Sequence, residues 1–206
     1  MRSTQGAALA LVLFGAGPAG ALPLLSEVFY DAVGSDDGQS FVELYGAVGS
    51  SLAGLLIEGV NGADGSVTHT LALTGTIGPD GLFVVADRTA AGTTSVPDAD
   101  LLLDFDFQNG PDSVVLRSAS GVLDALGYGA FLTGEINVGE GAPALDPPAG
   151  GSLARHFANV DTDDNAADFV AGAPTPGSAS LALPEPASTG LLGLGLLGLA
   201  RAGRRR

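Results

Sequence analysis

The residues best suited to chemistry in this chain are the acids and the amide of residues 161–165, which read Asp-Thr-Asp-Asp-Asn. Asp161, Asp163 and Asn165 carry side-chain oxygens at alternate positions, and calcium prefers oxygen ligands of this kind. The EF-hand pattern, however, requires glycine at its sixth position, where this chain has Ala166. The sequence therefore leaves two interpretations: a calcium site on these three residues, or an Asp-rich turn held by its own backbone hydrogen bonds.

Arg155 is the second candidate, because it is one of only three basic residues between residues 22 and 183. Glu27 and Glu43 each fall in the middle of an expected strand, between apolar neighbours. Carboxylates in such positions usually face solvent, but two of them on adjacent strands would repel each other if they were opposed. A guanidinium can hold both through charge-assisted hydrogen bonds. We therefore predict a structural ion pair of Arg155 with Glu27 or Glu43.

No catalytic motif accompanies these residues in the sequence. The chain has two histidines, His69 and His156, and neither falls in a nucleophile or zinc pattern. The serines that follow Gly49 lack the second glycine of a nucleophile elbow. A glycosidase needs two carboxylates placed across a sugar, but in so acidic a chain a nearby pair of acids does not distinguish one. We expect no enzymatic activity, no catalytic residue, and no cofactor apart from calcium at the candidate site.

The charge balance limits the classes of molecule that this protein is expected to bind. The chain has 23 acidic and 8 basic residues, and the stretch from 22 to 183 carries 22 acids against three arginines, a formal charge of −19. Such a body repels phosphate backbones, so we expect no nucleic-acid partner. The acidity is typical of a soluble surface, with a cation-binding surface as the alternative. Cysteine is absent, so packing without disulfides must hold an exported domain together.

The N-terminus has the three parts of a secretory signal peptide. Arg2 provides a positive start, an apolar run covers residues 7–14, and Ala19-Gly20-Ala21 supplies small residues at a cleavage site. We predict a signal peptide over residues 1–21 that signal peptidase removes. The alternative is a buried N-terminal helix.

The C-terminus also has three parts in a fixed order. Pro184, Glu185 and Pro186 come first, and an apolar stretch at residues 187–200 follows, which we expect to form a short hydrophobic helix. Four arginines then close the chain: Arg201, Arg204, Arg205 and Arg206.

This arrangement closely resembles the PEP-CTERM sorting signal. The resemblance implies processing by an exosortase near Pro184–Pro186 in a Gram-negative-type bacterium, and a location at the cell envelope, the outer surface or the extracellular matrix. A plain C-terminal membrane anchor is the alternative, since 14 apolar residues are fewer than the roughly 20 that span a bilayer as a helix.

Between the two ends, short apolar runs alternate with turns rich in glycine, proline and aspartate. About nine such runs at roughly ten-residue spacing predict an all-β domain, most simply a β-sandwich. Residues 131–151 predict a long surface loop, and residues 171–183 a linker. The expected strands cover residues 24–30, 41–45, 55–60, 67–73, 82–86, 99–107, 113–117, 122–128 and 153–157.

An ordered set of short phrases resembles the lamin tail domain family in its bacterial secreted form. The set covers residues 22–178 and includes LSEV at 25–28, FVELY at 41–45, FQNGPDSVVL at 107–116 and GVLDALGY at 121–128. The resemblance implies an immunoglobulin-like β-sandwich over residues 22–178, with residues 179–206 as linker and sorting tail. It also implies a module for display, adhesion or targeting rather than for a reaction.

Together these features predict a non-enzymatic extracellular structural or adhesion module. Signal peptidase and exosortase would be its partners during export, and extracellular polysaccharide or surface proteins its partners afterwards. The alternative is a calcium-dependent module that binds polysaccharide or protein. Under either interpretation we expect the C-terminal tail to contact the membrane, transiently or permanently.

Overall fold

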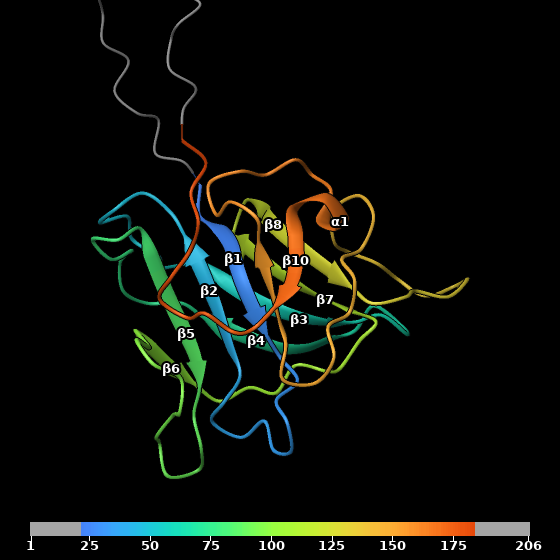
Figure 1. Cartoon of the computed structure of the whole chain (residues 1–206), viewed down its shortest axis with the longest axis horizontal. Coiled ribbons are helices and arrows are strands. Elements are labelled where there is room, and N and C mark those ends of the chain that lie inside the picture. The colour runs from blue at the N-terminus through green and yellow to red at the C-terminus, as the bar shows by residue number, and fades with distance from the viewer. Residues whose placement is uncertain (1–21, 184–206) are drawn as a thin grey trace, which may run out of the picture.

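The computed structural model describes residues 22–183, and in that range the chain folds almost entirely into β-strands (Figure 1). The predicted all-β class is therefore confirmed. The predicted signal peptide and its cleavage residues lie outside the described range, as do the sorting motif and the apolar and basic tail. The elements are β1 Leu24–Phe29, β2 Phe41–Tyr45, β3 Leu56–Asn61, β4 Val67–Ala72, β5 Leu82–Asp87, β6 Leu101–Leu103, β7 Asp112–Ser118, β8 Gly121–Tyr128, β9 Ser152–Arg155, α1 Asn165–Asp168 and β10 Phe169–Gly172.

The strands form two sheets. The six-stranded sheet has the order β10-β9-β1-β2-β5-β6, and the four-stranded sheet has the order β4-β3-β7-β8. All pairs are antiparallel except β5 and β6, which run parallel. Neighbours in sequence mostly lie beside each other, but β9 returns after a long connection to pair with β1. The residues of the candidate site are brought together by this return.

One hydrophobic core lies between the two sheets. Val28 and Val42 of the six-stranded sheet contribute to it, and so do Ile57, Val114 and Leu126 of the four-stranded sheet. Each of these residues is completely buried. Because side chains alternate between the faces of a strand, the residues between them point to the other face of their sheet.

The outer face of the six-stranded sheet is also covered. Phe29, Phe41 and Val84 form a second, smaller cluster there, with Val96 from a loop packed against them. Strands buried on both faces read as nearly continuous apolar runs, and β5, Leu82–Asp87, is buried at every position.

The chain enters and leaves the domain at the same end. Residues 22 and 183 both lie there, whereas the loops at residues 31–40 and 88–98 lie at the opposite end (Figure 1). The last stretch, residues 173–183, crosses the outer side of the six-stranded sheet on its way from β10 to that end (Figure 1).

Candidate functional site

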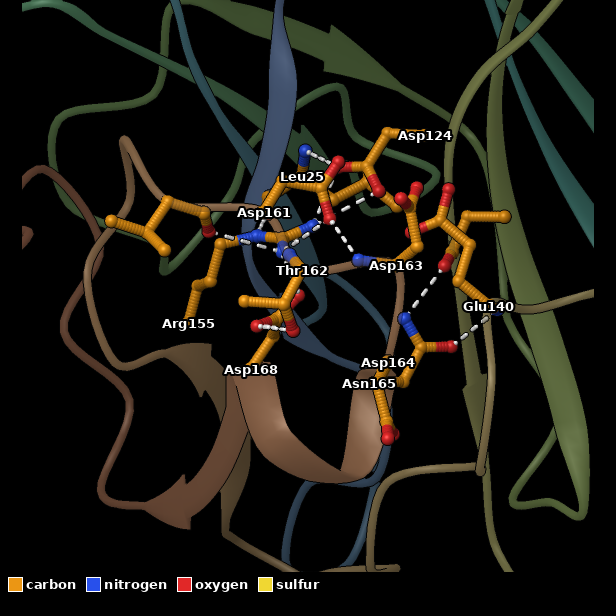
Figure 2. Close-up of polar contacts among 12 residues, drawn as sticks. Leu25, Asp124, Glu140, Arg155, Asp161, Thr162, Asp163, Asp164, Asn165 and Asp168 are labelled. Atoms are coloured by element: carbon orange, nitrogen blue, oxygen red, sulfur yellow. Dashed lines mark hydrogen bonds and ion pairs between the residues drawn. The ribbon is translucent and has the colours of Figure 1, made fainter.

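The most concentrated chemistry lies around Arg155, at the last residue of β9, where the side chain is 1% exposed. We call the group formed by Asp124, Glu140, Arg155, Asp161 and Asp168 the Arg155 cluster (Figure 2). Arg155 Nη2 donates to both carboxylate oxygens of Asp124 at 2.9 Å, and Nη1 donates to Asp168 at 2.7 Å and to Asp161 at 3.3 Å. These bonds surround one cation with three carboxylates.

The remaining polar surface of the guanidinium is also used. Arg155 Nε donates to the carbonyl oxygen of Leu25 at 3.0 Å, and Nη1 reaches the carbonyl oxygen of Val160 at 3.2 Å. The guanidinium carbon lies 4.6 Å from the ring centroid of Phe169, a cation–π distance. A planar fork with five donors suits this arrangement, and the compact ammonium of a lysine could not reproduce it.

Asp124 lies on β8, in the other sheet, and is fully buried. Its Oδ2 also accepts a hydrogen bond from the backbone N–H of Leu25 at 2.6 Å. Burial raises the pKa of the Asp124 carboxyl, and the nearby positive charge of Arg155 only partly offsets that effect. The carboxylate depends on Arg155, because a buried charge without a partner is strongly unfavourable.

Asp168, the last residue of α1, is the third carboxylate that binds Arg155. Besides Arg155 it accepts hydrogen bonds from Thr162, from the backbone N–H at 2.9 Å and from Oγ1 at 2.7 Å. Asp164 caps the start of this short helix, accepting from the backbone N–H of Ala166 at 3.2 Å. The Asp-rich stretch therefore makes its own turn, as one of the two interpretations of the sequence expected.

Asn165 has a structural role in this arrangement. Its Oδ1 accepts from the backbone N–H groups of Gly127 and Glu140, both at 2.8 Å, and its Nδ2 donates to the carbonyl oxygen of Ala125 at 2.8 Å. The side chain is fully buried and links β8 to the loop that carries Glu140. The Asn165 oxygen thus already accepts two backbone hydrogen bonds, and the predicted calcium set of Asp161, Asp163 and Asn165 stays a prediction.

The loop approaches β8 very closely at Gly139. A Cβ atom at that position would lie 2.1 Å from the backbone nitrogen of Gly127, which is not possible. Glycine at 139 therefore allows the contact that places Glu140 beside the cluster. The sequence predicted residues 131–151 only as a surface loop, and its contribution to the site was missed.

Glu140 is the member of the cluster whose charge is least compensated. Its Oε2 is buried and has no hydrogen-bond partner. One carboxylate oxygen from each of Glu140, Asp124 and Asp161 lies within 4.8 Å of the others. Burial raises the pKa of Glu140 to about 8, and the negative charges of Asp124 and Asp161 act in the same direction. At neutral pH the site favours either a proton on Glu140 or a cation beside it.

The prediction that Arg155 pairs with Glu27 or Glu43 is wrong. Arg155 lies two residues after Leu153, whose side chain is in the core, and so points into the space between the sheets. Glu27 is aligned with Ala154 across the β1–β9 pair and points to the outer face of the six-stranded sheet. The two side chains therefore lie on opposite faces of one sheet.

Glu27 and Glu43 form a second polar site on that outer face. They lie opposite each other across the β1–β2 pair and are 1% and 0% exposed. Glu27 accepts from Ser152 Oγ at 2.5 Å and from Thr175, through its N–H at 2.9 Å and its Oγ1 at 2.8 Å.

Both carboxylate oxygens of Glu43 accept hydrogen bonds. It accepts from Ser26 Oγ at 2.8 Å and from the N–H of Gly177 at 2.7 Å. Burial raises the pKa of Glu43 to about 7, although these hydrogen bonds lower it; the charges of Glu27 and Asp80 raise it further. The segment after β10 thus supplies donors to both glutamates.

The comparisons with known proteins identify the end of the chain. Residues 177–206 match the family model described as the PEP-CTERM protein-sorting motif, which confirms that part of the sequence interpretation. The comparison with curated proteins and the comparison with solved structures each found no match. The lamin tail resemblance has no support from these comparisons and stays a prediction.

The sorting motif indicates a class of exported proteins. A PEP-CTERM motif implies export, processing by exosortase, and a final location at the cell surface or outside the cell. Among residues 22–183, no helix is long and apolar enough to cross a membrane.

Proposed function

We propose that this protein is a non-enzymatic structural or adhesion module, displayed at the cell surface or in the exopolysaccharide matrix after exosortase processing. The observation that carries the proposal is the sorting motif, which follows directly on a β-sheet domain. An immunoglobulin-like, lamin-tail-type sandwich belongs to this proposal, and two sheets around one core support it.

The polar groups inside the domain also support a structural role. The carboxylates of Glu27 and Glu43 accept hydrogen bonds from residues of the same chain, and so does that of Asp168. Groups committed in this way hold segments together and are not free to take protons from a substrate.

A deletion strain tests the proposal. Loss of the protein should reduce retention of cells or polysaccharide in the matrix, and the full chain should restore it. The Glu185→Ala variant, which keeps the domain intact, should restore it poorly because it is not sorted. Full retention in the deletion strain would contradict an adhesive or structural role.

The alternative function, calcium-dependent binding of polysaccharide or protein, has one observation in its favour. The buried Oε2 of Glu140 has no partner, and carboxylate oxygens of Asp124 and Asp161 are close enough to share one ion with it. Calcium is bound by six to eight oxygens at 2.3–2.6 Å, so three carboxylates would supply part of such a shell. Asp161 is common to this set and to the set predicted from the sequence.

Thermal unfolding in millimolar calcium and in chelator tests the alternative. An ion at a hundred times its dissociation constant stabilises the folded state by about 2.7 kcal/mol. Glu140→Gln should abolish the calcium-dependent rise in Tm, whereas Asp163→Asn should retain it, because Asp163 is outside the three-carboxylate set. Equal Tm values with calcium and with chelator would exclude a calcium site, and matrix retention should then be independent of calcium.

A further inference from the structure

The segment that leads into the sorting motif is bound to the domain along its length. We call residues 173–183 the strap; it crosses the outer side of the six-stranded sheet and ends where the chain continues to Pro184 (Figure 1). The sequence predicted a linker over residues 171–183, and the lamin tail resemblance implied a domain over residues 22–178. Hydrogen bonds of residues 175–182 attach this stretch to the domain.

The first attachment of the strap is at the two glutamates. Thr175 and Gly177 donate to the buried carboxylates of Glu27 and Glu43. Gly177 has φ +79°, and a Cβ there would lie 3.0 Å from atoms of the Asp98 side chain, so the strap turns at a position that favours glycine. The two carboxylates of this attachment are buried, whereas Thr175 is exposed and Gly177 is half-buried; the attachment lies seven to nine residues before Pro184 in sequence.

The second attachment is close to the sorting motif. The backbone N–H of Ala158 donates to the carbonyl oxygen of Ser180 at 2.8 Å. The Asn159 side chain then binds Ala182 at both of its backbone groups: Nδ2 donates to the carbonyl oxygen at 2.9 Å, and Oδ1 accepts from the N–H at 2.7 Å. Ala182 lies two residues before Pro184, and Asn159 is exposed at the surface.

An extended peptide is commonly recognised through hydrogen bonds to its main-chain N–H and C=O groups. Exosortase acts on the motif at residues 177–206, and the sequence resemblance places cleavage near Pro184–Pro186. Main-chain recognition of the peptide that leads into this region would use the N–H and C=O groups of Ala182. In the folded domain the same two groups are occupied by Asn159, and the single N–H of Ala182 cannot donate to Asn159 and to the enzyme at once.

We infer that Asn159 is a positioning residue for sorting: its side chain competes with exosortase for the backbone of Ala182, and its release limits access to the cleavage region. This inference rests on exosortase processing of the chain, which the motif supports. The first attachment remains closed during this release, so the domain keeps its fold while residues 180–183 detach. Asn159 thus sets the rate of processing without contacting the enzyme.

A pulse-chase experiment on the full chain, in a host that carries exosortase, tests the inference. Asn159→Ala should be processed about tenfold faster than wild type, the order expected for losing one or two net hydrogen bonds. Asn159→Asp should be intermediate because it keeps the acceptor for the Ala182 N–H and loses the donor. Asn109→Ala is the matched control, since Asn109 is exposed and distant in sequence from the strap. It should be processed at the wild-type rate.

Hydrogen exchange on the same full-length variants provides the second readout. The amide of Ala182 should exchange faster in Asn159→Ala, while the amides of Thr175 and Gly177 should keep their protection. Faster exchange at Ala182 without faster processing would overturn the inference, and so would unchanged exchange at Ala182. If wild type itself were not processed in the presence of exosortase, the proposed sorting function would fail, and not only the role of Asn159.

Discussion

Arg155 and Asp124 form a two-point ion pair that joins the two sheets of the domain. Arg155 Nη2 lies 2.9 Å from both carboxylate oxygens of Asp124, and neither side chain is more than 1% exposed. Arg155 comes from β9 in the six-stranded sheet and Asp124 from β8 at the edge of the four-stranded sheet. The chain has no cysteine, so no disulfide can join the sheets, and this buried polar contact links them instead.

Replacing Arg155 should destabilise the domain strongly. Arg155→Leu leaves the carboxylates of Asp124 and Asp168 buried without a cation, and breaking a buried ion pair from one side costs about 3–5 kcal/mol. Arg117→Leu is the control: Arg117 pairs with Glu58 at 3.1 Å, but its side chain is 39% exposed. The control should lose about 0–1 kcal/mol. Denaturant midpoints measure both, and equal small losses would contradict a structural role for the cluster.

Stability should depend on the charge of Glu43. The pKa of Glu43 is about 7 in the folded protein, against an ordinary value of 4.5, so the folded state binds this proton more tightly than the unfolded chain does. The contribution is therefore fully present below pH 4.5 and is lost as the pH rises through about 7. Glu43→Gln should make the fall in unfolding free energy over this range shallower. An unchanged fall would show that other groups produce it.

Asn165→Ala should destabilise the domain whether or not calcium is present. The substitution leaves the N–H groups of Gly127 and Glu140 and the carbonyl of Ala125 without their partner, at about 1–3 kcal/mol for each group that stays buried and unpaired. Unfolding should be measured in chelator, with Asn109→Ala as a surface control. A loss of stability seen only in calcium would instead make Asn165 a metal ligand.

The Pro-Glu-Pro sequence should matter more for sorting than the apolar stretch behind it. Glu185→Ala, with residues 187–206 intact, should leave a precursor of full tail length in the membrane fraction. Immunoblotting of fractions separates precursor from processed protein. Normal processing of this variant would favour a simple membrane anchor.

The N-terminus of exported protein should be Leu22. The small residues at Ala19 and Ala21 match the preferences of signal peptidase, and the described domain begins with β1 at Leu24. Terminal sequencing of surface protein measures this directly. A terminus at Met1 would contradict cleavable export.

The strands could be predicted from the sequence because most of them carry a clear apolar pattern. β2 occurs at the predicted residues 41–45, with Val42 and Leu44 in the core between the sheets and Phe41 in the outer cluster. The alternation of side chains along β9 also explains why the Arg155 prediction is wrong. Arg155 shares a face with Leu153, so it could not reach a glutamate opposite Ala154.

The partners of Arg155 were harder to predict because each lies on a different element. Asp124 sits within an apolar run on β8, 31 residues before Arg155, and local sequence gives no sign that the two meet. Glu140 lies in a loop rich in glycine and proline. Such a loop has no regular alternation from which the direction of a side chain could be predicted. α1 and β10 were missed because each is four residues long, too short to show a period.

The position of residues 22 and 183 bears on which part of the domain could face outward. Both lie at one end, so in a protein held by its tail this end would be turned toward the envelope (Figure 1). The loops at residues 31–40 and 88–98, of which the first carries Asp36 and Asp37, would then stand farthest from the membrane. An epitope inserted in the second of these loops should be open to antibody on intact cells, whereas one fused before Leu22 should be shielded by the domain itself.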